Sequence, residues 1–424
     1  MMTKKSVIIS FTILLPVFSI SQKQSNIWYF GDYAGIDFSS GSPVALNDNA
    51  MWIFEGCASL CNNDGNLLFY TNGNLVYNKN HALIDTIGGS WTAVRGVVAF
   101  PAPGSDHEYY LFTTGATWDS YLKWHVLDMN LNGGLGGTVF KDSIISSYTT
   151  AEQVAAVRHE NGMDYWVATI DLDTTGGNVC DSIHIYRVTS MGIDTHLVFD
   201  YNDDTYSCEL KFSPDRRKLS TSYSIYDFDP STGILSNRVD IMAYKWNVYA
   251  SFSPNSRYLY LNDNGRLFQY DTYASNIPGS RITIASMAAF GESGQLQLAP
   301  DGKLYRAQQG FDPKQTRLSV VNCPNKRGAG CNFVKDQFTL AAGTGCSFGL
   351  PNLLDHYFER YDSACGTVPV RADYTYLSNC YGDSTEFVDL SFNATSWSWN
   401  FDDPSSGTAN TSTNQNPKHV FASA

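Results

Sequence analysis

Five acidic or amide side chains stand just before, or within, short apolar segments of similar pattern. They are Glu55 in FEGCASL, Glu152 in AEQVAAV, Glu209 in SCELKF, and Gln295 and Gln297 in GQLQLAP. Two carboxylates that face each other can serve as acid and base on a glycosidic bond. The alternatives are that these residues cap backbone groups of a channel, bind ordered water or hold a structural calcium ion, which prefers oxygen ligands.

Sequence motifs of known catalytic centres are absent. The chain contains no His-Glu-x-x-His, no Gly-x-Ser-x-Gly, no phosphate-binding loop and no Cys-x-x-Cys. Its eight histidines are scattered, and His81, His107 and His159 fall at expected turns or strand ends, where a solvated histidine is the usual interpretation. The sequence therefore indicates no catalytic residues and no cofactor beyond a structural calcium ion.

Aromatic residues form a second group of candidate ligand-binding residues. Trp91, Trp118, Tyr121 and Trp124 bracket a loop-rich stretch. Exposed aromatic rings stack on sugars, whereas buried rings pack one sheet against the next. Packing is the expectation here, because a fold made of several sheets needs bulky side chains between them.

The elements that must position these residues repeat along the chain. The clearest copies are CELKFSPDRRKLSTSY (208–223), YASFSPNSRYLYLND (249–263) and LQLAPDGKLYRAQ (296–308), and looser copies lie at 57–72, 97–114 and 154–170. Each copy reads as a strand, a tight turn and a second strand rich in aromatic residues. A multi-stranded repeat of about 40–50 residues is typical of a β-propeller blade.

A seventh blade is predicted from the two ends of the repeat region. Residues 26–46 read as three strands, and Ser347–Leu350 is predicted to add the innermost strand by pairing with Asn26–Phe30. Such pairing would close the ring and remove exposed sheet edges. The predicted fold is thus all-β, a seven-bladed β-propeller over residues 22–360, closed by N- and C-terminal strands.

Composition and charge agree with an exported protein. Aromatic residues make up 14% of the 424 residues and charged residues 16%, as in a β-rich globular chain. The net charge of −13 argues against nucleic acid or an anionic membrane as partner. Lys4-Lys5 and the following apolar run predict a secretory signal peptide over residues 1–21. No later run is long enough to insert into a membrane.

Nine cysteines in an exported chain indicate disulfides. Cys323 and Cys331 flank the turn-rich NKRGAG and are predicted to form one. Cys57 and Cys61 are not expected to pair with each other, because four residues of extended strand span about 13 Å.

Several runs together resemble one family. They are EGCASLCNNDGNLLFYTNGNLVYNKN, AEQVAAVRHENGMDYWVATI, LKFSPDRRKLS, ASFSPNSRYLY, LQLAPDGKLY and FGLPNLL. In order, they are similar to the propeller at the N-terminus of large secreted bacterial surface proteins. Such proteins often continue into PKD repeats and end in a gliding-motility-associated, type IX secretion sorting domain. Arg216-Arg217 and Asn255-Ser256 depart from the Asp-Gly turn of the family, and we expect an altered turn geometry at these sites.

The tail resembles a PKD repeat, which is an immunoglobulin-like β-sandwich. After an expected linker at 361–371, the run Trp399-Asn400-Phe401-Asp402-Asp403 follows the repeat's W-x-F-G-D pattern with Asp402 in place of glycine. Residues 372–424 are too few for all strands of such a sandwich. We therefore expect a partial PKD domain, with a C-terminal sorting domain for the secretion machinery outside this chain.

The expected function is that of a secreted, cell-surface protein without enzymatic activity. Its propeller would bind a glycan or another surface protein through Glu55, Glu152, Glu209, Gln295 and Gln297 at the central funnel. The alternatives are a polysaccharide-active enzyme, a hydrolase or lyase, that uses the funnel carboxylates, and a passive structural spacer. The fold alone does not distinguish these functions.

Overall fold

The structure is a computed structural model, which describes residues 23–116, 120–173, 179–203, 209–242, 248–263, 265–286, 294–308, 315–358, 365, 374–377, 384–389 and 396–422. The predicted signal peptide, Trp118, and the predicted linker other than Cys365 lie outside these residues. The chain divides into two compact units, of which one spans Ser21–Gly366 and the other includes Thr367–Ala424.

The described residues of the larger unit form seven antiparallel sheets. The first sheet contains β1 (Ile27–Phe30), β2 (Ala34–Asp37) and β3 (Val44–Leu46). The second contains β4 (Ala58–Cys61), β5 (Leu67–Thr71), β6 (Leu75–Asn78) and β7 (Leu83–Thr86), and the third β8 (Val97–Pro101), β9 (Glu108–Thr113), β10 (Lys123–Asp128) and β11 (Gly137–Ile144). The fourth contains β12 (Thr150–Arg158), β13 (Tyr165–Asp173), β14 (Val179–Thr189) and β15 (Gly192–Asp203).

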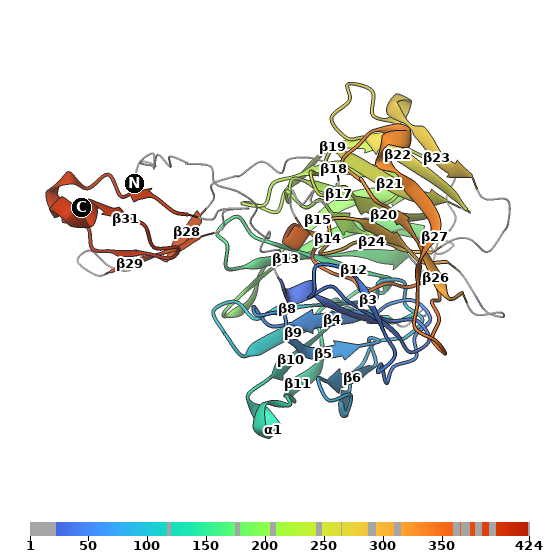
Figure 1. The fold of residues 1–424 in the computed structure, drawn as a ribbon, viewed down its shortest axis with the longest axis horizontal. Helices are drawn as coiled ribbons and strands as arrows, with labels where there is room; N and C mark the ends of the chain where they lie inside the picture. Colours follow the sequence, from blue (N-terminus) through green and yellow to red (C-terminus); the bar gives the residue numbers. More distant parts are fainter. Residues whose placement is uncertain are drawn as a thin grey trace. The chain divides into compact units, whose positions relative to one another are not determined.

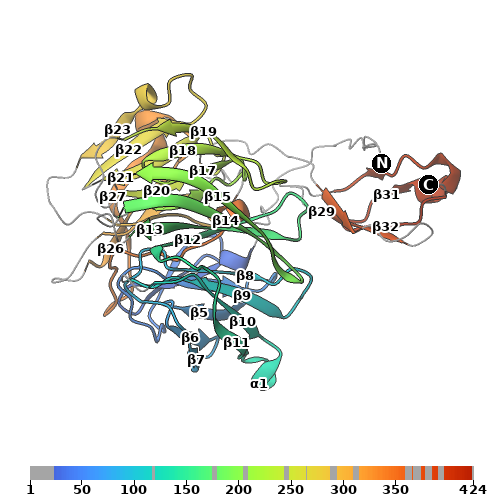
Figure 2. The ribbon, with the colours of Figure 1, turned by 180° about the vertical axis from the view of Figure 1, so that it is seen from behind.

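The other three sheets have the same order of strands. The fifth contains β16 (Lys211–Phe212), β17 (Lys218–Ser220), β18 (Ser224–Phe228) and β19 (Leu235–Asp240). The sixth contains β20 (Val248–Phe252), β21 (Tyr258–Asp263), β22 (Arg266–Asp271) and β23 (Ile282–Ser286), and the seventh β24 (Leu296–Leu298), β25 (Leu304–Arg306), β26 (Arg317–Val321) and β27 (Phe333–Thr339). In each sheet the strands lie side by side in chain order (Figure 1; Figure 2).

The sheets are arranged as the blades of a propeller. The first strands of successive sheets contact one another, from β1 through β4, β8, β12, β16 and β20 to β24. Trp28 of β1 contacts Tyr305 of β25, with ring centroids 5.8 Å apart, so the first and last sheets are neighbours. The first strands therefore surround the centre, and the prediction of an all-β, seven-bladed β-propeller is confirmed.

Helical segments in the described part of the propeller are short. They are η1 (Lys23–Ser25), α1 (Leu131–Gly134), η2 (Pro278–Ser280), η3 (Gly328–Cys331) and η4 (Asp355–Phe358). Among the described residues, no helix combines the length and the apolar character that a membrane crossing would require.

Large aromatic side chains pack within and between blades. Phe100 of the third sheet stacks on Tyr165 of the fourth, with ring centroids 4.3 Å apart. Trp124 lies against Tyr110 and Phe112 at centroid distances of 4.9 and 6.1 Å. The packing role expected for Trp124 is thus confirmed, and burial of such rings is a large favourable contribution to folding.

The strand–turn–strand units keep one turn geometry even where their sequences differ. Gly302 occupies the left-handed region with φ 74°, and Arg216 and Ser256 take the same place in their own turns with φ 62° and 61°. Each residue also donates its backbone N–H to the carbonyl three positions earlier. The expected change of turn geometry at these sites is therefore wrong, because the backbone hydrogen bonds hold non-glycine residues in this conformation.

The two ends of the propeller sequence meet at a different place from the one predicted. Ser347–Leu350 does not pair with β1, whose described strand partner is β2. Instead, Asp32 and Gly345 exchange two backbone hydrogen bonds of 2.8 and 3.0 Å. Residues 347–350 do not form the predicted strand, because their backbone is hydrogen-bonded elsewhere. The Phe348 N–H donates to the carbonyl of Phe54, which precedes β4 near the centre of the propeller.

The segment after Gly345 ties several blades together. The Asn352 side-chain amide donates to the Val154 carbonyl at 2.8 Å and to the Val97 carbonyl at 3.0 Å, and the Asn352 backbone N–H donates to Cys57. A Cβ at Gly349 would lie 1.4 Å from the Glu55 carbonyl oxygen, so only glycine fits. One segment thus satisfies backbone groups that the ends of three blades would otherwise leave unpaired.

A disulfide in the larger unit joins Cys323 to Cys365, with Cα atoms 5.6 Å apart. The predicted Cys323–Cys331 pair is wrong: Cys331 is a free, buried thiol. Its backbone carbonyl accepts a hydrogen bond from the Cys323 N–H, while burial raises the pKa of its sulfur. Cys57 and Cys61 are both free and buried, in agreement with the expectation that they do not bond to each other.

The described residues of the smaller unit form two small sheets. One contains β28 (Tyr374–Leu377), β29 (Thr385–Asp389) and β32 (Lys418–His419), and the other β30 (Trp399–Asn400) and β31 (Thr411–Ser412), with η5 at Pro404–Asn410. Phe387, Trp399 and Phe401 form its buried core. Asp402 has φ 53°, so it adopts the left-handed turn conformation although it is not glycine.

Candidate ligand-binding funnel

Four of the five predicted funnel residues stand at or before the start of a first strand. Glu55 precedes β4, Glu152 is near the start of β12, Glu209 precedes β16 and Gln295 precedes β24. Gln297 lies within β24. Because the first strands surround the centre, their starting ends bring these residues towards one end of the propeller's centre.

Glu55 and Glu152 form a carboxyl pair. Burial raises the pKa of Glu55 to about 8, with the Glu152 charge as a second cause. Burial also raises the pKa of Glu152 to about 7, against the effect of the Val94 N–H, which donates to a Glu152 carboxylate oxygen at 3.1 Å. Among the described residues, no cation pairs with either carboxyl group. The pair is therefore uncompensated in charge.

Apolar and aromatic side chains surround this pair. Tyr249, Val94 and Phe348 form a buried cluster against which Phe54 packs. Burial raises the pKa of Tyr249, and the negative charges of Glu55 and Glu152 raise it further. The setting limits hydration of the carboxyl groups, and this is the physical cause of their raised pKa values.

An exposed pair of tryptophans adjoins the carboxyl pair. Trp52 and Trp91 are 41% and 42% exposed, with ring centroids 4.9 Å apart. The Glu55 N–H donates to the Trp91 carbonyl at 3.4 Å, and Trp52 lies three residues before Glu55. Trp91 is thus largely exposed, whereas Trp124 packs against aromatic rings of the third sheet. We call Trp52, Trp91, Glu55 and Glu152 the funnel site.

A fully buried set of charges lies beside the funnel site. Arg95 pairs with Glu209, and Lys211 pairs with Asp355 at 3.0 Å. The Gln297 side chain joins the two pairs, because its carbonyl oxygen accepts from Arg95 at 3.2 Å and from Lys211 at 2.9 Å. Its amide group donates to Asp355 at 2.9 Å. Two positive and two negative groups thus balance one another.

Burial also lowers the pKa values of the two cations in this set. The pKa of Arg95 falls to about 10 and that of Lys211 to about 8, although the Asp355 carboxylate opposes both shifts. Both values remain above neutral pH, so both groups carry a charge there. Groups held in such mutual pairs stabilise one arrangement of the blades and are not free to bind a ligand.

The structure separates the predicted site residues by role. Glu55 and Glu152 come together at the funnel site, whereas Glu209 and Gln297 belong to the buried charge set. Gln295 accepts the Leu350 N–H at 2.9 Å and so holds the segment that follows Gly345. Sequence reasoning missed Arg95, Lys211, Asp355, Tyr249 and Trp52. Arg95 and Lys211 do occupy the positions around the starts of β8 and β16, and that placement could have identified them.

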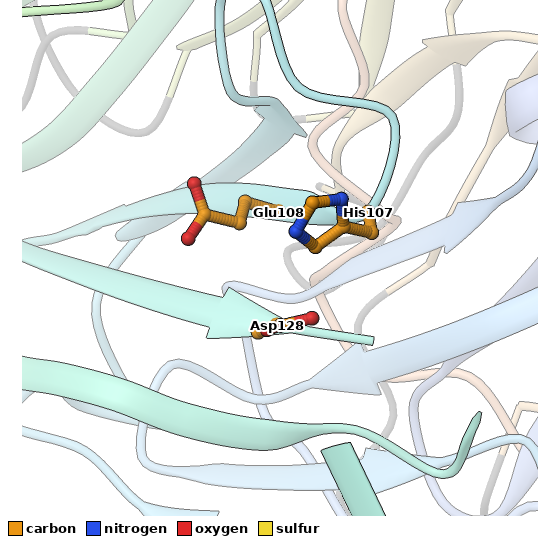
Figure 3. A group of neighbouring side chains, drawn as sticks. All are labelled: His107, Glu108 and Asp128. Atoms are coloured by element: carbon orange, nitrogen blue, oxygen red, sulfur yellow. The ribbon is translucent and has the colours of Figure 1, made fainter. Parts of the chain in front are cut away.

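One group of side chains could hold a metal ion. His107, Glu108 and Asp128 each offer a ligand atom within 4.8 Å of the others, from the start of β9 and the end of the neighbouring β10 (Figure 3). His107 is engaged with Asp106 at 2.7 Å, which is the main cause of the raised pKa of its imidazole. The turn before β9 lies at the opposite end of β8 from Val94, so this group is not part of the funnel site.

Comparisons with known proteins do not extend these observations. No family model matches the chain, and no curated protein matches it. Solved structures resemble it weakly. Hydrazine synthase from Kuenenia stuttgartiensis is 14% identical, with 68% of this chain and 89% of that chain covered and a TM-score of 0.39. A functionally unknown protein from Desulfotomaculum acetoxidans is 9% identical over 74% and 88%, with a TM-score of 0.39.

A streptogramin B lyase structure is 9% identical over 70% of this chain and 85% of that chain, with a TM-score of 0.35. Likenesses this weak carry no argument about function, and the fold assignment rests on the seven sheets themselves.

Proposed function

We propose that this protein is a non-enzymatic binding protein whose propeller holds a glycan at the funnel site. The observation that supports the proposal is the exposed Trp52–Trp91 pair beside the Glu55–Glu152 carboxyl pair. Flat aromatic faces stack on the C–H faces of sugar rings, and carboxyl groups bond to sugar hydroxyls. An apolar surface with a few convergent polar groups is the usual composition of a ligand site.

A surface protein is the other partner expected from the sequence. The two tryptophans favour a glycan, because they offer ring faces next to hydrogen-bonding groups within a small area. The buried charge set supports a binding role for the funnel. Its four charged groups pair with one another and with Gln297. They would therefore hold the blades in place and would not position a reacting group.

One observation favours the alternative of a polysaccharide-active enzyme. Glu55 and Glu152 have pKa values raised to about 8 and about 7, and a carboxyl group that stays protonated near neutral pH suits general acid catalysis. Binding and catalysis make different predictions for the same variants. Loss of a general acid or base lowers turnover by about 100- to 10,000-fold, whereas a binder has no turnover to lose.

The test is binding to neutral, acidic and amine-bearing oligosaccharides, measured by calorimetry, with reducing ends assayed in the same samples. Trp52→Ala and Trp91→Ala should each weaken glycan binding about tenfold, as expected for the loss of one aromatic contact at a binding surface. Tyr376→Ala, which removes an exposed ring from the smaller unit, is the matched control and should bind normally.

The outcomes distinguish the three functions. Binding that depends on the tryptophans and releases no reducing ends supports the proposal. Cleavage that is lost in Glu55→Gln and Glu152→Gln establishes the enzyme instead. No binding to any glycan overturns the proposal and leaves a surface-protein partner or a passive spacer.

We also propose that the protein is exported to the cell surface, with the type IX secretion machinery as its export partner and a PKD-type repeat after the propeller. The signal-like residues 1–21 and the W-x-F-x-D run around Asp402 support this proposal. N-terminal sequencing of the exported protein should begin near residue 22. A mature protein that retains Met1 inside the cell would contradict export.

A further inference from the structure

We infer that the funnel site selects an amino sugar with a free amine, held as an ammonium group by Glu55 and Glu152 and stacked on Trp52 and Trp91. This inference rests on the proposed glycan binding and names the class of sugar. It starts from the charge of the site, where two carboxyl groups lie together without a cation among the described residues.

The charged and titratable groups around the pair do not supply that cation. Tyr249, whose pKa responds to both carboxyl groups, is a neutral phenol near pH 7, because the ordinary pKa of a phenol already lies well above that pH and burial raises it further. Arg95 is engaged elsewhere, because its guanidinium pairs with Glu209 and donates to Gln297. Lys211 is paired with Asp355. A positive charge on the ligand would therefore supply the counter-charge that no described cation gives to Glu55 and Glu152.

The tryptophans favour an organic cation over a metal ion. Calcium requires six to eight oxygen ligands, and the two carboxyl groups supply at most four. An ammonium group needs fewer partners, and it is attracted to the face of a tryptophan ring by the ring's quadrupole. An amino sugar combines this charge with a flat ring face that can stack.

Matched oligosaccharides test the inference directly. Glucosamine hexamers and N-acetylglucosamine hexamers differ only in the acetyl groups that remove the amine's charge. At pH 7 we expect the free-amine hexamer to bind the full-length protein about ten- to a hundredfold more tightly, because hydrogen bonds between charged groups are the stronger ones. Binding should also release protons, measured as a dependence of the calorimetric enthalpy on the buffer, because the ammonium group drives the carboxyl groups to ionise.

Variants separate the two kinds of contact. Glu55→Gln and Glu152→Gln keep the shape of the site and should abolish the preference for the free amine while leaving the weaker binding of the acetylated hexamer. Trp52→Ala should weaken both ligands equally. The melting temperature of each variant verifies folding, and a change of ligand preference within one folded variant does not depend on its stability.

The results distinguish failure of the inference from failure of the proposed function. Equal affinity for the two hexamers, or a preference for the free amine that survives both glutamine substitutions, overturns the amino-sugar inference while glycan binding stands. No binding of either hexamer, together with binding of a different glycan, also overturns the inference alone. No binding of any glycan overturns both.

Discussion

Arg95 and Glu209 form a buried ion pair that joins the third sheet to the fifth across the centre of the propeller. Their exposed fractions are 0% and 1%. The Glu209 carboxylate also accepts the Ala250 N–H of the sixth sheet. Each charge has lost its hydration and depends on its partner, so this pair links blades that share no strand.

Breaking this pair should destabilise the propeller strongly. Glu209→Gln leaves the Arg95 guanidinium buried without its carboxylate and should lower the free energy of unfolding by about 3–5 kcal/mol. Chemical denaturation at pH 7 measures this change. The control is Lys141→Gln, whose ion pair with Asp85 is partly exposed and should contribute less than about 1 kcal/mol. Equal effects of the two substitutions would contradict a structural role for the buried pair.

Stability should fall as the pH rises from about 4.5 to about 8 because of Glu55 and Glu152. Their pKa values are raised from 4.5 to about 8 and about 7, so the folded protein holds these protons more tightly than the unfolded chain. Their contribution is therefore fully present below pH 4.5 and is lost as the pH passes through the folded-state values, by on the order of 1–3 kcal/mol.

The variant Glu55→Gln/Glu152→Gln tests this dependence. Melting temperatures of the wild type and the variant should converge at pH 4.5 and separate at pH 8, where the variant is more stable. Other titrating groups are common to both proteins and cancel in the difference. A difference that does not depend on pH would show that these carboxyl groups titrate normally.

The disulfide prediction concerns connectivity and stability. Peptide mapping without reduction should recover a fragment that joins Cys323 to Cys365, and Cys331→Ala should leave that fragment intact. The substitutions Cys323→Ser/Cys365→Ser should lower the free energy of unfolding by about 2–4 kcal/mol, since a crosslink restricts the unfolded chain. Recovery of a Cys323–Cys331 fragment would instead support the pairing predicted from the sequence.

Replacing Arg216 by glycine should stabilise the fifth sheet. Arg216 has φ 62°, which costs a side chain about 1 kcal/mol that glycine does not pay. We expect Arg216→Gly to raise the free energy of unfolding by up to about this amount. Its neighbour offers the control: Arg217 lies outside the left-handed region, so Arg217→Gly should lower stability. A loss of stability in both variants would show that the Arg216 side chain contributes more than its backbone strain costs.

The sequence by itself determined that the chain is built of strand–turn–strand units and how many blades these units form. Turns such as Ser-Pro-Asp between alternating apolar runs are local signals, because proline and the residue after it restrict the backbone wherever they occur. Counting these turns predicted six blades, and the three strands expected in residues 26–46 predicted the seventh. The positions of Glu55 and Glu152 before or within first strands predicted that they would meet at the centre. The local pattern also placed Glu209 and Gln297 there.

Only the tertiary structure decided what each of these residues contacts. Glu209 reads like Glu55 in sequence, but Arg95 lies against Glu209 and no described cation lies against Glu55. The disulfide partner of Cys323 is 42 residues away, beyond the reach of any local pattern. The exposure of Trp91 and the partial burial of Trp124 likewise depend on neighbours from other parts of the chain. Such contacts arise when distant segments pack together, so no short stretch of sequence encodes them.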